Sequence, residues 1–456
     1  MGEDVKGRQK FVETKAAIAR CAVLHLDIRA RVGGSEDAAL DQPTNRDPEA
    51  RLAEAVALTQ AIDLHVVESV VVPVRKVRPA TIVGEGIIEQ WHQLAHEAHI
   101  EVIVIDARLT PVQQRNLERG LECKVIDRTA LILEIFGARA RTREGTLQVE
   151  LAQLTYQRSR LVRSWTHLER QRGGAGFMGG PGESQLELDR RIIADKIDRL
   201  KRDLEKVRQT RKLQREWRQA TPVPVIAIVG YTNAGKSTLF NRLTNADVLA
   251  QDMLFATLDP TLRKFTLGSG QEVVFADTVG FVSDLPHELV DAFRATLEEV
   301  QQADLVLHVR NVAHGDWDSQ RQDVHQVLES LGTFNVENPI PTFEVWNKCD
   351  LPTAEPRLGL REQSAQDPKP FITSAVTGEG LAELTAAIDQ FVTRTRVSHD
   401  FLVPFALGAP LAWLHAHGDV VSVDATEEGN RVSVRLTAKD FARFEHQFKD
   451  SAVEKL

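Results

Sequence analysis

Residues 225–238 read VIAIVGYTNAGKST, an apolar run that leads into a loop with two glycines and a lysine. Such a run is typical of a buried strand, and the glycines allow backbone N–H groups to wrap around a phosphate at the start of the following helix. We therefore predict a phosphate-binding loop on a parallel α/β sheet. The expected ligand contacts are Gly230, Tyr231, Thr232, Asn233, Ala234, Gly235, Lys236, Ser237 and Thr238.

Two side chains of this loop have predicted roles. Lys236 is expected to neutralise the β- and γ-phosphates of a nucleotide. Ser237 is expected to give its hydroxyl oxygen to Mg²⁺, an ion that prefers oxygen ligands and is shared with the phosphates. The loop alone is also consistent with an ATPase, so the choice of nucleotide depends on motifs farther along the chain.

A second apolar strand, VVFADTVG at 273–280, ends in a carboxylate that can hold the metal through water. The N–H of Gly280 can sense the γ-phosphate. The loop FATLDPT at 255–261 lies between the two motifs, and we assign Thr257 as a further Mg²⁺ ligand in the triphosphate state; a threonine in a surface turn is the alternative. The expected contacts of the second motif are Asp277, Thr278, Val279 and Gly280.

The nucleotide base is predicted by two further strand ends, EVWNKCD at 344–350 and FITSAVTGEG at 371–380. The carboxylate of Asp350 can accept two N–H groups from guanine N1 and N2, a pair of donors that adenine lacks. The N–H of Ala375 can reach guanine O6. The expected base contacts are Asn347, Lys348, Asp350, Ser374, Ala375 and Val376.

Together the four motifs predict an enzyme that hydrolyses GTP to GDP and phosphate. Phe281 occupies the place where Ras-like enzymes carry the glutamine that orients water, so intrinsic hydrolysis is expected to be slow. In similar GTPases an asparagine placed like Asn233 helps hold K⁺ against the phosphates; an asparagine chosen for a tight turn is the alternative. The residues expected to act in hydrolysis are Lys236, Thr257, Gly280 and Asn233.

Changes in hydrophobic period divide the rest of the chain. Strands and helices alternate before residue 144, apolar residues then follow a heptad-like spacing on both sides of a glycine-rich stretch, and strands and helices return after residue 221. We predict a multidomain α/β protein. Its parts are a mobile N-terminal tail (1–46), a parallel α/β domain (47–144), a long antiparallel helical hairpin (145–220) with a glycine-rich tip (173–182), a P-loop GTPase domain (221–395) and a small α+β C-terminal domain (396–456).

Charge and cysteine content restrict the setting and the partners. The net charge is -9, yet residues 157–218 contain 17 Lys+Arg and 9 Asp+Glu. The hairpin can therefore contact RNA phosphates, although a solvated helix face with i,i+4 ion pairs would look similar. Three cysteines without metal-ligand spacing, and no apolar run near the ~20 residues of a membrane span, predict a reduced cytoplasmic protein. The histidines within 92–99 are interpreted as a polar helix face.

With these residues in view, the chain resembles the HflX-type GTPases. The resemblance covers roughly 47–456 and is most specific at GGPGESQLELDRR (179–191), DTVGFVSDLP (277–286) and LFATLDPT (254–261). It implies a GTPase that is stimulated by ribosomes. It also implies a hairpin that binds the large (50S) subunit and its rRNA, and an activity that dissociates stalled or idle 70S ribosomes. We further expect a monomer with Mg²⁺, GTP or GDP, and K⁺ as its small ligands.

Two other functions stay open at this point. One is a GTP-gated assembly or hibernation factor that binds ribosomes without splitting them. The other is a related K⁺-dependent GTPase that modifies tRNA, which would need a reactive cysteine near the carboxyl terminus; the sequence printed there is SAVEKL.

Overall fold

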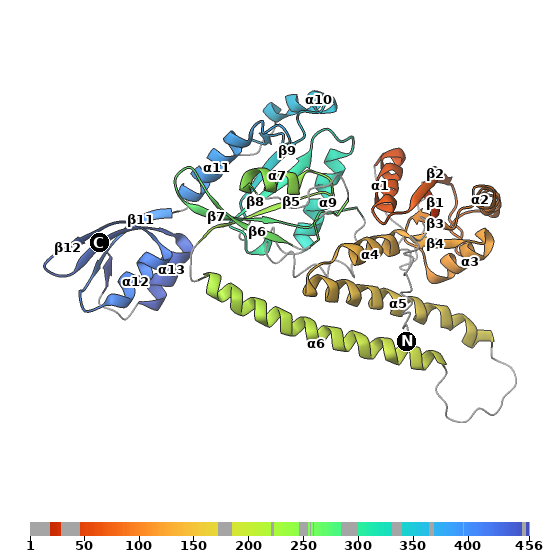
Figure 1. Ribbon diagram of the computed structural model, residues 1–456, viewed down its shortest axis with the longest axis horizontal. Helices are drawn as coiled ribbons and strands as arrows, with labels where there is room; N and C mark the ends of the chain where they lie inside the picture. Colours follow the sequence, from red (N-terminus) through yellow and green to blue (C-terminus); the bar gives the residue numbers. More distant parts are fainter. Residues whose placement is uncertain are drawn as a thin grey trace, which may run out of the picture. The chain divides into compact units, whose positions relative to one another are not determined.

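The computed structural model describes residues 19–28, 46–171, 185–219, 223–245, 254–255, 257–258, 260–283, 300–330, 340–363, 369–394, 396–448 and 453–455. The chain divides into two compact units, the first formed by 1–44 and 48–132 and the second by 45–47 and 133–456. Figure 1 shows the elements of each. Within the described ranges, no helix has the length and apolar character needed to cross a membrane.

The first unit is a four-stranded parallel sheet with helices beside it. The strand order is β2-β1-β3-β4. The strands are β1 (Arg20–Ile28), β2 (His65–Val74), β3 (Val102–Asp106) and β4 (Lys124–Asp127). The helices are α1 (Pro48–Gln60), α2 (Glu85–Glu97) and α3 (Pro111–Leu121), and α4 (Arg128–Arg139) begins here. A capping box starts α3, because the Thr110 hydroxyl accepts from the Gln113 N–H and Gln113 Oε1 accepts from the Thr110 N–H.

The prediction of a mobile tail over 1–46 is wrong for Arg20–Ile28, which form β1, an inner strand of this sheet. Cys21, Ala22 and Val23 are completely buried. An inner strand of a parallel sheet is covered on both faces, so it is a short apolar run without alternation. The polar stretch that follows dominated the composition and masked this strand; most of that stretch lies outside the described residues.

The second unit contains the predicted helical hairpin, whose two long helices lie side by side (Figure 1). They are α5 (Arg143–Gln171) and α6 (Gln185–Gln219). Ile197, Leu200 and Leu204 of α6 are buried at the predicted three- and four-residue spacing. The glycine-rich tip at 173–182 lies outside the described residues.

The GTPase domain is a six-stranded sheet with the order β10-β9-β8-β5-β7-β6, parallel except for the β6–β7 pair. Side chains of α7 and α11 share one apolar core with the inner strands. The strands are β5 (Val225–Gly230), β6 (Thr261–Thr266), β7 (Glu272–Asp277), β8 (Leu305–Asn311), β9 (Thr342–Asn347) and β10 (Phe371–Ile372). The helices are α7 (Lys236–Thr244), α9 (Trp317–Ser330), α10 (Glu355–Leu358), α11 (Leu381–Arg394) and the 3₁₀ turns η1 (Pro352–Ala354) and η2 (Gly359–Gln363).

The C-terminal region is a small antiparallel sheet with the order β12-β13-β11-β14. Two helices pack their apolar residues against it. The elements are β11 (Arg396–Val403), α12 (Gly408–His417), β12 (Asp419–Ala425), β13 (Asn430–Thr437), α13 (Ala438–Gln447) and β14 (Glu454–Lys455). The multidomain α/β fold class is therefore confirmed.

Candidate nucleotide site

The glycine-rich loop leaves the buried strand β5 and turns directly into α7. Gly235, the residue before the helix, has a φ of 92°, which side chains other than glycine rarely adopt. A Cβ at Gly235 would lie 2.2 Å from Asn347 Nδ2, so space as well as conformation requires glycine. The backbone N–H groups at this helix start form the arrangement that binds phosphate.

Lys236 is buried in the loop that it follows. Its Nζ donates to the carbonyl oxygen of Tyr231 at 2.8 Å. Burial lowers the pKa of Lys236 to about 8, although the nearby Asp277 carboxylate opposes this shift. An anionic ligand at this place would stabilise the charged ammonium group, as a phosphate does.

Three oxygen-bearing side chains from separate segments converge where a divalent ion is predicted. Ser237 Oγ lies 2.8 Å from Thr257 Oγ1 and donates to Asp277 Oδ2 at 2.7 Å, and Thr257 donates to the same oxygen at 3.0 Å. Asp277 is completely buried, and burial raises its pKa. Its other oxygen, Oδ1, is buried with no hydrogen-bond partner among the residues that the structure describes. This hard-oxygen donor set with an unsatisfied carboxylate fits Mg²⁺.

The segment after β7 is joined to the phosphate loop by backbone hydrogen bonds. Thr232 N–H donates to Phe281 O at 2.7 Å, and Phe281 N–H donates to Gly230 O at 3.1 Å. A Cβ at Gly280 would lie 2.8 Å from Thr232 Cγ2 and 3.0 Å from Lys236 Nζ, so this backbone passes close to the glycine-rich loop and its lysine. The Phe281 side chain is a buried phenyl ring, and a phenyl ring has no polar group that could orient an attacking water.

The base-reading loops contact the phosphate loop through Asn347. Its Nδ2 donates to Ala234 O at 2.9 Å, and its Oδ1 accepts from Ala375 N–H at 3.0 Å. Asn347 therefore joins three of the predicted motifs in the structure. Asp350 and Val376 are exposed at the ends of their loops, and Ser374 is buried.

Asn233 has two structural features that favour the tight-turn interpretation. Its φ is 56°, in the left-handed region that asparagine tolerates better than most residues. Its Oδ1 accepts a hydrogen bond from Lys348 Nζ at 3.1 Å. A K⁺ ion bound to this oxygen would lie close to the positive charge of Lys348, which opposes its binding.

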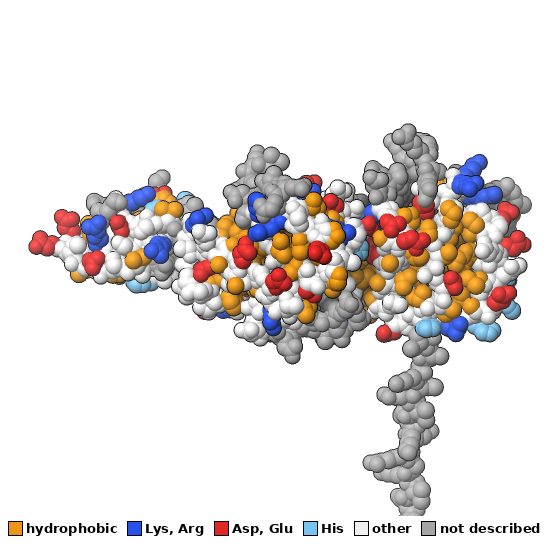
Figure 2. Space-filling model, turned by 90° about the horizontal axis from the view of Figure 1, so that it is seen from above, with side chains coloured by type: hydrophobic (Ala, Val, Ile, Leu, Met, Phe, Trp, Pro, Cys, Tyr) orange, Lys and Arg blue, Asp and Glu red, His pale blue; other side chains and the backbone are white. Residues whose placement is uncertain are grey.

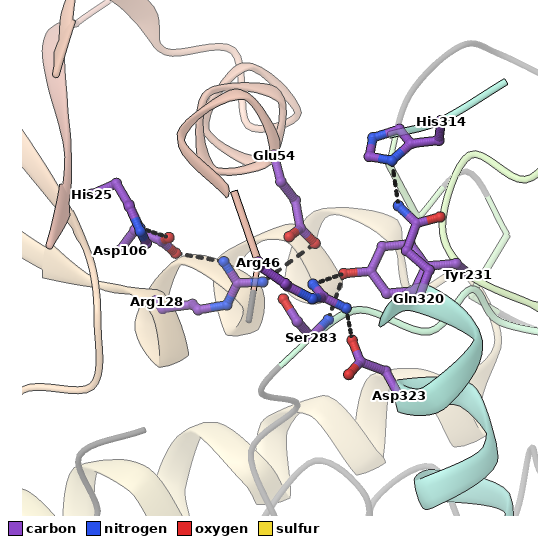
Figure 3. A network of polar contacts seen from close by, with 10 residues as sticks. All are labelled: His25, Arg46, Glu54, Asp106, Arg128, Tyr231, Ser283, His314, Gln320 and Asp323. Atoms are coloured by element: carbon purple, nitrogen blue, oxygen red, sulfur yellow. Dashed lines mark hydrogen bonds and ion pairs between the residues drawn. The ribbon is translucent and has the colours of Figure 1, made fainter. Parts of the chain in front are cut away.

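Some contacts at the site were not predicted from sequence. Phe255, two residues before Thr257, packs edge-on against Phe136 of α4 with ring centroids 4.6 Å apart. The Tyr231 hydroxyl accepts from Ser283 N–H at 2.8 Å, and Arg46 lies between this hydroxyl and Asp323 (Figure 3). The partners are 185 and 277 residues from Arg46, so no local pattern could have revealed them.

Family comparisons agree with this geometry. The family model described as "GTP-binding GTPase N-terminal" matches residues 49–137, "GTP-binding GTPase Middle Region" matches 139–218, and "50S ribosome-binding GTPase" matches 225–348. A GTPase HflX from Magnetococcus marinus is 46% identical over 91% of this chain and 95% of its own length. A GTPase HflX from Escherichia coli is 47% identical over 72% of this chain and 75% of its own length.

Among solved structures, a GTP-binding protein from Sulfolobus solfataricus in complex with GDP covers 82% of this chain and 99% of its own, with 22% identity and a TM-score of 0.41.

The glycine-rich loop, the buried Asp277 carboxylate and the Asn347 loop lie on one mostly parallel sheet. With the family matches, this fold defines a P-loop enzyme that binds GTP and GDP and hydrolyses GTP. The sequence identity of 46% with a curated relative, over 91% of this chain, also shows which family of such enzymes the chain belongs to. The chain belongs to the HflX GTPase family.

Proposed function

We propose that this GTPase is a cytoplasmic, monomeric factor that binds the large ribosomal subunit through the α5–α6 hairpin and dissociates stalled or idle ribosomes. The observation that carries the proposal is a long two-helix hairpin with exposed basic side chains in the same chain as a GTP site. On α6 these are Arg190, Arg191, Lys196, Arg199, Lys201 and Arg202. On the face drawn in Figure 2, basic and acidic side chains are instead scattered among apolar ones.

Electrostatics explains why such a hairpin suits rRNA. Lysine and arginine contacts to phosphates release counterions and supply most of the affinity that does not depend on base sequence. Carboxylates also occur on α6, and Lys206 pairs with Asp203 at 3.0 Å, so part of the charge is neutralised within the helix. The expected contact is thus a set of phosphate contacts with a marked dependence on salt.

In the nucleotide site we propose Ser237 and Thr257 as protein ligands of Mg²⁺, with Asp277 acting through water. Lys236 holds the β- and γ-phosphates, Gly280 donates its N–H to the γ-phosphate, and Asp350 accepts from guanine. The convergence of Ser237, Thr257 and Asp277 within 3.0 Å supports this assignment. When bound, Mg²⁺ neutralises charge on the phosphates during transfer.

The decisive test is GTP turnover with and without purified 50S subunits, in K⁺ and in Na⁺ buffer. Wild type is expected to be slow alone and strongly stimulated by 50S subunits, and Lys236→Ala is expected to lose turnover in both conditions. An unchanged rate with 50S subunits contradicts ribosome binding. A higher rate in K⁺ than in Na⁺ would support the K⁺ role of Asn233, and equal rates would support the turn interpretation.

A charge-reversal pair tests the hairpin. Arg199→Glu with Arg202→Glu on α6 is expected to weaken 50S binding and reduce its salt dependence. Arg115→Glu with Arg119→Glu on α3 is the matched control, because both arginines are exposed and lie outside the hairpin. Light scattering of 70S ribosomes with a non-hydrolysable GTP analogue then separates the two functions: dissociation supports splitting, and binding without dissociation supports an assembly or hibernation factor.

A further inference from the structure

The side chain of Tyr231, the second residue of the phosphate loop, contacts the segment that follows β7. It is buried, and its hydroxyl accepts a hydrogen bond from the N–H of Ser283 at 2.8 Å. Ser283 follows Gly280 by three residues, in the segment that carries the proposed γ-phosphate contact. Tyr231 therefore joins the loop that holds the nucleotide to the segment that distinguishes GTP from GDP.

This side-chain contact extends a short backbone ladder. Tyr231 forms a parallel bridge with Phe281. In this bridge the Thr232 N–H donates to the Phe281 carbonyl oxygen at 2.7 Å, and the Phe281 N–H donates to the Gly230 carbonyl oxygen at 3.1 Å. The Ser283 contact closes the carboxyl end of the ladder. Gly280 immediately precedes the ladder, so its position depends on how firmly the following residues are held.

Arg46 supports the Tyr231 hydroxyl from a distant part of the sequence. One guanidinium nitrogen donates to that hydroxyl at 3.5 Å, the other forms an ion pair with Asp323 of α9, and the guanidinium carbon lies 5.8 Å from the Tyr231 ring centre (Figure 3). The Arg46 side chain is 5% exposed, whereas Asp323 is 27% exposed. Since a buried guanidinium needs hydrogen-bond partners, its pairing here fixes Tyr231 as well as Arg46.

We propose that Tyr231 and Arg46 are positioning residues for GTP hydrolysis. Tyr231 holds the start of the Phe281–Ser283 segment against the phosphate loop so that Gly280 can reach the γ-phosphate, and Arg46 with Asp323 holds Tyr231. The pair acts on the γ-phosphate segment and not on the α- and β-phosphates, so it sets the preference for GTP over GDP. This role is independent of ribosome binding and applies to the enzyme alone.

The test compares the affinities for GDP and for a β,γ-imido GTP analogue in the presence of Mg²⁺, using the full chain. Tyr231→Phe removes the acceptor of two donors, and we expect the analogue-to-GDP affinity ratio to fall about tenfold, the effect of one lost buried hydrogen bond. GDP affinity is expected to stay within about twofold of wild type, because the lost hydroxyl contacts Ser283 and Arg46 and the backbone N–H groups of the phosphate loop are unchanged. The kcat for GTP should fall with the ratio.

Arg46 variants separate positioning from general stability. Arg46→Ala is expected to lower the same ratio about threefold, and Arg46→Lys to restore part of it, because lysine can pair with Asp323 but lacks the fork that reaches two partners. A double-mutant cycle of Arg46→Ala with Asp323→Asn should be non-additive. Lys264→Ala is the control, because it removes an exposed ion pair with Glu272 in the same domain.

Equal losses for GDP and the analogue in Tyr231→Phe would mean that the phosphate loop itself has deformed, and this outcome overturns the proposal. No change in the ratio for any Arg46 or Tyr231 variant also overturns it. If Tyr231→Phe does not fold, Asp323→Asn is tested in its place. Asp323 lies on α9, so this substitution leaves the sequence of the phosphate loop unchanged. A lowered ratio in Asp323→Asn with unchanged GDP affinity supports the proposal.

Discussion

Asp106 and Asp277 are both buried aspartates that end parallel strands, one in each unit of the molecule. Both oxygens of Asp106 are paired: Oδ1 with Arg128 Nη1 at 2.5 Å and Oδ2 with His25 Nδ1 at 2.7 Å, and Arg128 continues to Glu54 at 3.3 Å (Figure 3). Only Oδ2 of Asp277 is paired within the described part of the chain. The two strand ends share a topology but differ in how completely their polar groups are satisfied.

The pKa values of the two carboxyl groups shift in opposite directions. Burial raises the pKa of Asp106, but the charge of Arg128 and the hydrogen bond from His25 outweigh it, so its pKa lies well below the usual range. Burial also raises the pKa of Asp277, and there the Ser237, Lys236 and Thr257 contacts do not compensate. A carboxylate satisfied by the protein stabilises the fold, whereas one left unsatisfied is available to a metal ion or ligand.

The largest expected effect is on GTP turnover, which should depend on Asp277 and not on Asp106. Asp277→Asn should reduce kcat/KM for GTP by about 1,000-fold, the upper range for one lost electrostatic contact in a transition state. The unfolding midpoint without nucleotide should be unchanged or higher, because one oxygen of this buried carboxylate lacks a hydrogen-bond partner among the described residues and destabilises the fold. Steady-state turnover and thermal unfolding check this. A variant that unfolds with little loss of turnover would reverse the distinction.

Asp106→Asn should have the opposite profile, a loss of stability with turnover per folded molecule retained. Removing one partner of a buried ion pair costs about 3–5 kcal/mol. A carboxyl group with a depressed pKa stabilises the fold above its unfolded pKa of about 4 and stops doing so as the pH falls through its folded pKa. The difference in the free energy of unfolding between wild type and variant should therefore be largest at neutral pH and smaller in acid. Hydrogen exchange of the β1 and β3 amides measures it.

Asp350 offers an exposed aspartate for comparison with the two buried ones. Asp350→Asn should weaken GTP binding about 100-fold, because the amide no longer accepts both guanine N–H groups. Xanthosine triphosphate carries an oxygen where guanine has its amino group, so its affinity should rise in the variant. Competition against a fluorescent nucleotide measures the affinities for both triphosphates. Equal losses of affinity for the two triphosphates would exclude Asp350 as the residue that recognises the base.

The smallest expected effect is the loss of stability from removing one local hydrogen bond in the first unit, at the start of α3. Thr110→Ala removes the side-chain oxygen of the α3 capping box and should cost about 1 kcal/mol. Thr110→Ser keeps the hydroxyl and should cost less. Urea unfolding of both variants measures the difference, and GTP turnover should not change. A loss as large as that of Asp106→Asn would mean that the ion network is not the main support of this sheet edge.

Each nucleotide-site motif could be read from the sequence because it is a continuous run at the end of a strand. The structure brings Ser237, Thr257 and Asp277 together as expected. The extra role of Asn347, which joins the phosphate loop to Ala375, is a contact between segments and has no local pattern. The fold class was predictable from the alternating periods of strands and helices.

What the sequence did not reveal has two physical causes. A single inner strand such as β1 is too short and uniformly apolar to show a period, so the polar residues near it dominated the prediction. Contacts such as Arg46 with Asp323, or His25 with Asp106, join residues far apart in the chain and depend on the finished fold. Sequence reasoning finds chemistry that is contiguous and misses chemistry that the fold assembles.

The position of β1 has a practical consequence for shortening this protein. A chain trimmed to begin near residue 47 would keep every nucleotide-binding motif, yet it would lose the strand that pairs with both β2 and β3. The remaining strands could not simply close the gap, because β2 and β3 each pair with β1 and not with one another. Such a trimmed protein would expose two unpaired strand edges and would be prone to aggregate, even though its GTPase domain is complete.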